Sequence, residues 1–250
     1  MSVIRKGGID GDPVFRGMAA SRLNILADGE QLLGGCGMRM DPPTAYVFPD
    51  AYTRVTLIKG PQTVLNGPGA SAGTVLFERS VPRFDEPGMA ADAAVGGGSF
   101  GRWDAFVDGR VGNRQGHFQL QGSRAESGDY RDGNGRDVHS AYRRENAEAS
   151  IGWRPDEDTL VELRAGSSRA RAAYGDRSMD GARFDREHVG LKVARERLSP
   201  LVHQLEGQVF HNDIDHVMDN HSLRTPPANL AQWMASNPDR AGFSAAGRPA

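Results

Sequence analysis

The chain has 250 residues, of which 38% are hydrophobic, and a formal net charge of −2 at pH 7. It has no dense block of lysine and arginine, which argues against a nucleic-acid partner, and no apolar run approaches the roughly 18 residues that a membrane-spanning helix needs. A membrane β-barrel is not excluded by hydropathy, because its strands alternate apolar and polar residues.

The N-terminal sequence Met-Ser-Val-Ile-Arg-Lys-Gly-Gly lacks the apolar core of a signal peptide. We therefore expect either that the protein stays inside the cell or that its true N-terminus lies upstream of Met1. The single cysteine, Cys36, fits a reducing compartment or a secreted protein with a free, reactive thiol.

Residues 1–87 have the pattern of short strands separated by glycine turns. The Asp28-Gly29 pair is a strong turn signal, and residues 62–67 are a short helical turn at most. The predicted strands are rich in apolar and β-branched residues and cover residues 23–26, 52–58 and 74–78. This pattern predicts a compact mixed α/β domain.

From Gly88 onward the pattern changes to period two, which is typical of strands with two different faces. One face is apolar, and we expect its side chains to point outward toward lipid while their polar alternates point toward the N-terminal domain. The clearest outward residues are Trp103, Val107, Phe118, Leu120, Ile151, Val189 and Leu191. Residues 223–250 are rich in Pro, Ala, Asn and Gly and predict an extended loop or tail.

The turns between these strands alternate in length. Residues 112–116 and 154–158 are short turns, whereas the polar, glycine-rich segments 125–141 and 168–184 are long. Short turns on one side and long loops on the other are typical of an outer-membrane barrel. Alternation alone also fits a soluble β-sandwich, in which a second sheet would cover the apolar face.

Soft metal ligands occur at two places about 180 residues apart. Cys36, Met38 and Met40 lie in Gly-Gly-Cys-Gly-Met-Arg-Met, and His216 and Met218 lie in Asp-His-Val-Met-Asp. Thiolate, thioether and imidazole together suit Cu(I) better than Ca²⁺, Mg²⁺ or Mn²⁺, which prefer oxygen. Residues i and i+2 share one face of a strand, so His216 and Met218 can present two ligands together.

The first part of the chain resembles the plug domain of TonB-dependent outer-membrane receptors. The resemblance rests on Arg16-Gly17-Met18, Asp28-Gly29, the run Val55-Thr56-Leu57-Ile58-Lys59-Gly60-Pro61-Gln62-Thr63-Val64-Leu65-Asn66-Gly67, and the small residues from Ala70 to Val75. Within that superfamily, Cys-x-x-x-Met combined with the later His-x-Met resembles the copper-receptor branch.

The resemblance implies that Cys36, Met40, His216 and Met218 bind copper, with Cu(I) as the expected oxidation state, between plug and barrel. Met38 is not carried over as a ligand. The implied fold is mainly β, with the C-terminal portion of a plug over residues 1–87 and the N-terminal portion of an incomplete barrel over residues 88–250. The implied location is the outer membrane, and the implied partners are copper, lipid and the TonB energy-coupling protein.

The chain departs from this family in length. Such receptors have barrels of about 22 strands, whereas the sequence here suggests roughly seven, and an open sheet leaves an unpaired edge that a hydrocarbon core does not tolerate. We therefore expect the chain to be a fragment of a larger receptor.

Two other functions remain open. One is a TonB-dependent receptor for a metallophore, held by side chains such as Arg39, Tyr46 and Phe48. The other is a soluble β-sandwich binding module. An enzyme is not expected, because no Ser-His-Asp set, paired-carboxylate site or phosphate loop stands out, and Gly96-Gly97-Gly98 lacks the strand-to-helix context of a phosphate loop.

Overall fold

The computed structural model describes residues 2–5, 7–8, 11–36, 41–60, 66–67, 71–200, 202–226, 228, 231–232 and 234–238. Of these residues 59% lie in strands and 5% in helical turns, so the predicted mainly β fold is confirmed. No helix in these ranges is both long enough and apolar enough to cross a membrane.

The N-terminal part forms a small mixed sheet in the order β4-β3-β6-β5. Its strands are β3 (Leu23–Ala27), β4 (Glu30–Gln31), β5 (Arg54–Lys59) and β6 (Gly73–Glu78). β3 and β6 are parallel, whereas β4 pairs with β3 and β5 with β6 in antiparallel fashion. Asp28 and Gly29 form the predicted turn, with φ angles of 50° and 88° that favour glycine and aspartate.

Shorter elements surround this sheet. β1 (Ser2–Arg5) and β2 (Gly11–Val14) form an antiparallel pair. The helical turns are η1 (Ala20–Arg22), η2 (Pro43–Tyr46) and η3 (Pro49–Ala51). The helical turn predicted for residues 62–67 falls mainly outside the described residues. The core of this part is apolar and includes Phe15, Leu23, Ile25, Leu32, Val47, Val75 and Phe77.

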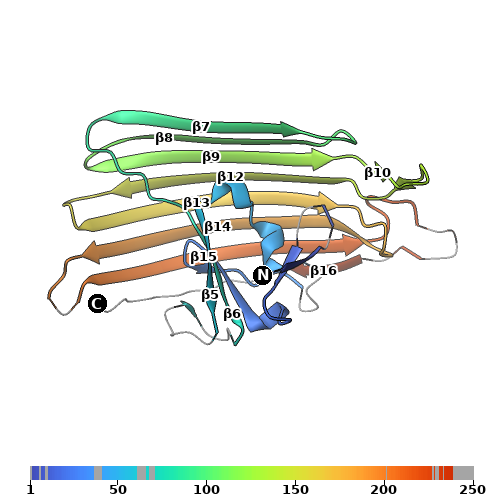
Figure 1. The fold of residues 1–250 in the computed structure, drawn as a ribbon, viewed down its shortest axis with the longest axis horizontal. Helices are drawn as coiled ribbons and strands as arrows, with labels where there is room; N and C mark the ends of the chain where they lie inside the picture. Colours follow the sequence, from blue (N-terminus) through green and yellow to red (C-terminus); the bar gives the residue numbers. More distant parts are fainter. Residues whose placement is uncertain are drawn as a thin grey trace.

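The rest of the chain forms one large antiparallel sheet in the order β16-β15-β14-β13-β12-β9-β8-β7 (Figure 1). Its strands are β7 (Gly88–Gly97), β8 (Trp103–Asn113), β9 (Gly116–Ser127), β12 (Tyr142–Trp153), β13 (Thr159–Ala172), β14 (Asp180–Glu196), β15 (Gln204–Asp219) and β16 (Met234–Pro238). The sheet does not close on itself.

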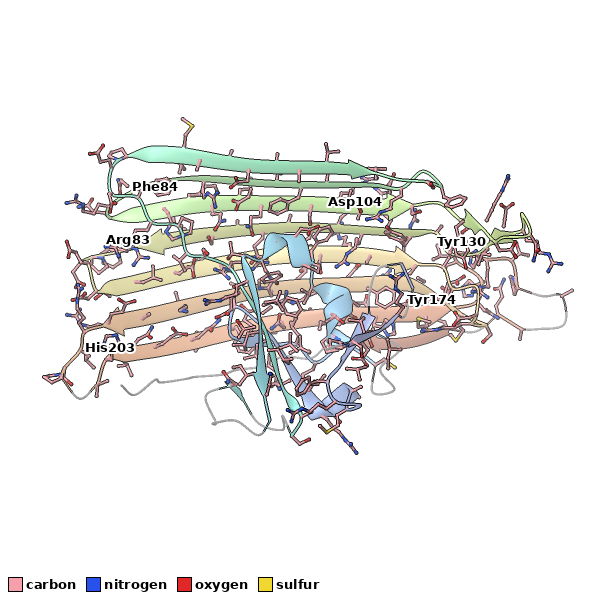
Figure 2. The ribbon with its side chains drawn as sticks, in the orientation of Figure 1. Arg83, Phe84, Asp104, Tyr130, Tyr174 and His203 are labelled. Atoms are coloured by element: carbon pink, nitrogen blue, oxygen red, sulfur yellow. The ribbon has the colours of Figure 1, made fainter. Side chains whose placement is uncertain are left out.

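Both short turns and the long segment before β12 lie where the sequence predicts them, but the long loop predicted at 168–184 is wrong. β13 continues to Ala172 and β14 begins at Asp180, because the polar residues of this segment pair across the two strands, and only residues 173–179 connect them. β8 and β9 are joined by two residues and β12 and β13 by residues 154–158. The segment between β9 and β12 instead contains a separate hairpin, β10 (Tyr130–Arg131) with β11 (Asp137–Val138). In Figure 2, the labelled residues Tyr130 and Tyr174 lie at the long-loop end, and Arg83, Phe84 and His203 lie toward the other.

The large sheet is apolar outside and polar inside. Six of the seven predicted outward side chains are between 40% and 55% exposed: Val107, Phe118, Leu120, Ile151, Val189 and Leu191. Trp103 is only half-exposed, because its indole N–H donates to Glu126 over 2.6 Å and the Arg124 guanidinium lies over its ring. The alternating polar residues are buried, among them Asp108, Gln119, Glu148, Glu162, Arg164 and His188.

The N-terminal part lies against the polar face of the large sheet, in front of its lower strands in Figure 1. Arg79, just after β6, pairs with Glu148 of β12, and Glu30 of β4 pairs with Arg186 of β14. This polar face is therefore an interface between two parts of the chain rather than a solvated surface.

One of the two edge strands differs from the sequence prediction. β7 lies where strands are predicted from Gly88 onward, although its alanine and glycine residues give little contrast between its two faces. β16 lies inside the segment predicted as loop or tail, and it forms because it pairs with residues 215–219 of β15. Both strands lie at the edges of the sheet, where pairing on one side suffices.

The interior between β9 and β12 is tightly packed at Gly152, and this predicts a substitution effect. A Cβ built on Gly152 would lie 2.1 Å from the ring of the buried His117, whereas a Cβ on Gly109 meets nothing within 4 Å. Gly152→Ala should lower the free energy of unfolding by about 1–3 kcal/mol through overpacking. Gly109→Ala is the matched control, and equal denaturation midpoints for the two variants in purified protein would contradict this packing.

Candidate metal centre

The loop between β4 and η2 approaches the wall of the large sheet through two glycines. Gly34 has a φ of +68°, and a Cβ built on it would lie 2.6 Å from the carbonyl oxygen of Asp41. A Cβ on Gly35 would lie 2.8 Å from the Cβ of His216 in β15. Since only glycine tolerates such contacts and such a φ without strain, this pair lets Cys36 come close to β15.

Asp41 closes the same loop through its carboxylate. Its Oδ2 accepts hydrogen bonds from the Gly35 amide over 2.5 Å and from the Tyr46 hydroxyl over 2.6 Å. Its Oδ1 accepts a hydrogen bond from the Cys36 amide over 2.8 Å. Both ends of the loop are thus tied to one buried side chain.

Three potential ligand atoms converge where the loop meets the wall. One atom each from Cys36, Asp41 and His216 lies within 4.8 Å of the other two, and all three residues are buried. Cys36 and Asp41 belong to the N-terminal part, whereas His216 belongs to β15. The fold therefore brings together the two sequence regions whose side chains were predicted to meet.

His216 is the least satisfied polar group of this cluster. The residue is 1% exposed, and among the described residues neither ring nitrogen has a hydrogen-bond partner. Its ring packs against Phe184, with 4.9 Å between centroids, and its Nδ1 lies 3.9 Å from Asp41 Oδ1. Because buried polar groups are nearly always hydrogen-bonded, this imidazole is suited to receive a ligand.

Met218 lies on the same buried face of β15, two residues beyond His216. It is 1% exposed and belongs to an apolar cluster with Tyr46, Met179, Phe184 and Ile214. The i, i+2 geometry predicted for His216 and Met218 is therefore present, and the thioether lies in a water-excluded environment next to the imidazole along the strand.

The predicted ligand set is only partly described by the structure. Cys36 and His216 meet, and Met218 shares the face of His216, while Met40 and the neighbouring Met38 lie outside the described residues. Ligation by Cys36, Met40, His216 and Met218 stays a prediction. The sequence analysis did not predict Asp41 as part of the site. The only indication in the sequence was its position directly after the candidate ligand Met40.

The donor atoms fit a soft metal ion. A thiol, an imidazole and a nearby thioether are the donors that Cu(I) prefers, whereas the carboxylate of Asp41 is a hard donor already engaged by three hydrogen bonds. The described donors that remain available are therefore the sulfur and nitrogen atoms.

A buried network of charges also joins the N-terminal part to the large sheet. Arg79 pairs with Asp28 over 2.6 Å and with Glu148 over 3.2 Å, and Arg164 also pairs with Asp28. Burial raises the pKa of Asp28, but the guanidinium groups of Arg79 and Arg164 outweigh burial and hold that pKa below its ordinary value of 3.8. Asp28 is therefore the anion that two buried cations share.

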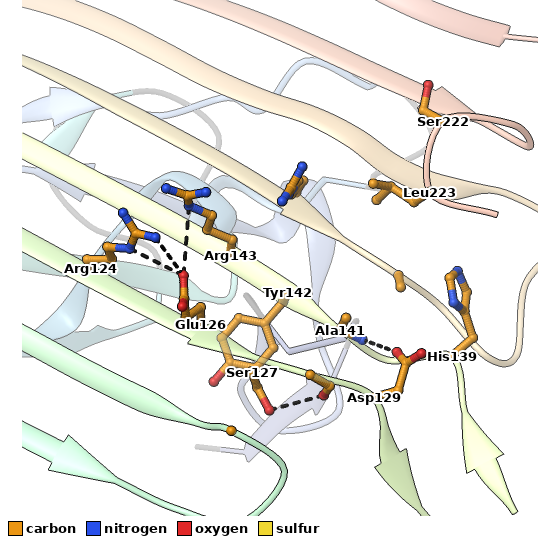
Figure 3. Close-up of a pocket in the computed structure, with 14 residues that line it drawn as sticks. Arg124, Glu126, Ser127, Asp129, His139, Ala141, Tyr142, Arg143, Ser222 and Leu223 are labelled. Atoms are coloured by element: carbon orange, nitrogen blue, oxygen red, sulfur yellow. Dashed lines mark hydrogen bonds and ion pairs between the residues drawn. The ribbon is translucent and has the colours of Figure 1, made fainter.

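A cavity of about 650 Å³ lies at the long-loop end of the sheet (Figure 3). Three arginines line it, and two of them are paired: Arg124 and Arg143 both contact Glu145, over 2.9 Å and 2.7 Å. Arg171 lines the same cavity, together with Tyr142 and His139. Glu126 and Asp129 line the cavity as well, and Glu126 accepts a hydrogen bond from Arg124 over 2.8 Å, so the lining is of mixed charge.

The chain is similar in sequence and fold to known proteins. Residues 2–74 match the family described as TonB-dependent Receptor Plug Domain. The chain is similar to the solved structure of the Copper transporter OprC, with 51% identity and a TM-score of 0.86, over 90% of this chain and 35% of that one. No curated protein matches the chain.

More distant solved structures share the fold alone. The FrpB iron transporter from Neisseria meningitidis has 15% identity and a TM-score of 0.68, over 85% of this chain and 36% of that one. The siderophore receptor PirA from Acinetobacter baumannii has 14% identity and a TM-score of 0.59, over 91% and 37% of the two chains. The chain thus spans little more than a third of the length of these proteins.

The pairing of Asp28 with two buried arginines predicts the effect of replacing Asp28. Asp28→Asn leaves Arg79 with Glu148 and Arg164 with Glu162 as their remaining partners, and the free energy of unfolding should fall by about 1.5–3 kcal/mol. The stabilisation from Asp28 is present above its ordinary pKa of 3.8 and is lost as the pH falls through its lowered folded-state value. The difference between wild type and variant should therefore shrink below pH 3.8.

Denaturant unfolding at several pH values measures this effect. Asp156→Asn is the control, because Asp156 pairs with Arg195 at the surface, where the two side chains are 49% and 47% exposed. That variant should leave stability nearly unchanged. A difference between wild type and Asp28→Asn that stays constant down to acidic pH would contradict the assignment.

Proposed function

Because this chain carries the plug domain of a TonB-dependent receptor together with wall strands of the kind that surround such a plug, we propose that it is part of a receptor for copper uptake across the outer membrane. In this proposal residues 1–87 are the C-terminal portion of the plug, and residues 88–250 are the N-terminal portion of the barrel. Copper is the cargo, and Cys36, Met40, His216 and Met218 bind it between plug and wall, as Cu(I).

The observation that carries this proposal is the meeting of Cys36 from the plug with His216 from the wall. The pair is buried, and the imidazole has no hydrogen-bond partner among the described residues for either ring nitrogen. Such a pair of soft and borderline donors, excluded from water, favours a metal ion with little affinity for oxygen. Met218, buried on the same face of β15, supplies a thioether to the same region.

The likeness to OprC supports copper over iron as the cargo. That protein is named a copper transporter, and it is 51% identical to this chain over 90% of it, whereas FrpB and PirA share the fold at 15% and 14% identity. The other elements of the proposal follow from membership of such a receptor: the outward apolar face contacts outer-membrane lipid, and the TonB protein supplies the energy for transport.

The arginine-lined cavity supports a second candidate, a receptor for an anionic metallophore. Guanidinium groups bind carboxylate and phosphate groups of a chelator in bidentate fashion. Arg171 lines this cavity beside Arg124 and Arg143, which are already paired with Glu145. The two candidates differ in what binds tightly, which is a bare copper ion in the first and only an organic complex in the second.

Replacement of Cys36 tests the copper proposal. Cys36→Ala removes the softest donor, and tight binding of bare copper ions should be lost, because thiolate donors dominate affinity for Cu(I). Met38→Ala should have a much smaller effect. Metal content of the purified, detergent-solubilised protein after incubation with copper measures both variants, and equal copper content in wild type and Cys36→Ala would leave the metallophore candidate ahead.

Two histidines of β15 supply a matched pair for a further test. His216 is buried beside Cys36, whereas His211 lies on the opposite, exposed face of the same strand. His216→Ala should weaken copper binding strongly, and His211→Ala should leave it unchanged, in a competition titration against a Cu(I) chelator. Equal losses in the two variants would contradict a ligand at His216.

A further inference from the structure

Asp41 is the one described side chain that touches both halves of the proposed copper site. Its Oδ1 accepts the hydrogen bond from the Cys36 amide over 2.8 Å and lies 3.9 Å from Nδ1 of His216. Its Oδ2 is held by the Gly35 amide and the Tyr46 hydroxyl. The side chain has no exposed surface, so bulk water does not compete with these contacts.

We propose that Asp41 is a positioning residue of the copper site, which fixes Cys36 and orients the His216 imidazole without binding the metal itself. This inference rests on the proposed function. Because the carboxylate lies beside Nδ1, the proposal makes Nε2 of His216 the ligand nitrogen.

The carboxylate acts on the imidazole through its charge. A separation of 3.9 Å exceeds hydrogen-bond length, but a negative charge at this distance, in a site that excludes water, favours the tautomer with its proton on Nδ1. That tautomer leaves the lone pair of Nε2 free for a metal. Metal-binding histidines commonly have a carboxylate in this position, and loss of such a partner lowers metal affinity about 10–100-fold.

An aspartate is required here because both oxygens accept hydrogen bonds. The Gly35 and Cys36 amides point at different oxygens of Asp41. Asparagine has one acceptor oxygen, so its NH₂ group would face one of these amides or the imidazole. An amide that donates toward Nδ1 would place the imidazole proton on Nε2 and block the ligand nitrogen.

Three hydrogen bonds also argue against Asp41 as a ligand. Each oxygen already accepts at least one N–H or O–H group, and a carboxylate is a poor donor for Cu(I) compared with sulfur. Replacement of Asp41 should therefore weaken copper binding by misplacing His216 and Cys36, and not by removing a metal ligand.

The test combines Asp41→Asn with His216→Ala in the detergent-solubilised protein. Competition titration with a Cu(I) chelator should give about 10–100-fold weaker copper binding for Asp41→Asn. On the His216→Ala background the same change should cause a smaller further loss, because only the contact with Cys36 is then left to lose. Asp129→Asn is the control, because Asp129 clamps another loop by accepting from the amides of Ser140 and Ala141, both over 2.8 Å. It should bind copper as wild type does.

X-ray absorption of the copper-loaded wild type and Asp41→Asn gives a second measurement. Sulfur scatterers and one light scatterer per copper, with the multiple scattering of an imidazole, are expected, and a second light scatterer per copper in wild type that is absent from Asp41→Asn would overturn the proposal. Wild-type affinity in Asp41→Asn, with binding still lost in His216→Ala, would overturn this inference and leave the proposed function standing. Absence of copper binding by wild type would overturn both.

Discussion

The placement of the plug against the wall depends on the pairing of charges that water cannot reach. Arg79 with Glu148, and Glu30 with Arg186, join the two parts of the chain through side chains that are nearly all buried. A buried charge that loses its partner costs several kcal/mol, so shifted placements of the plug are strongly disfavoured. Glu30 is six residues before Cys36, and this anchor therefore also decides where the cysteine loop meets β15.

The pattern of the wall strands was predictable from sequence, because alternation in residues such as Phe118, Leu120 and Ile151 reports which side of a strand is apolar. The sequence could not distinguish a solvated polar face from a buried one. Glu148 and Arg164 have the spacing of surface residues, and their burial follows only from the plug that covers them. β16 was not predicted, because it lies in a segment rich in proline and alanine and forms only through its pairing with β15.

The candidate site was predictable only in part. Cys36 and His216 are far apart in sequence, so no local spacing could pair them, and the prediction depended on the resemblance to a receptor family. The structure brings these two side chains together, while Met40 lies outside the described residues. Asp41 could not be predicted, because an aspartate followed by two prolines ordinarily marks a turn and its hydrogen bonds to Gly35 and Cys36 depend on the folded loop.

The division of the site between plug and wall has a consequence for release. In the proposed copper site, two donors on the plug and two on the large sheet form a chelate only while these parts stay in contact, since the second pair then acts at a high effective concentration. A displacement of the cysteine loop away from His216 by a few ångströms would leave the metal with two protein ligands in place of four, while the two ligands on each part stay together. The metal's residence time would then be set by mechanical separation rather than by the strength of any single bond.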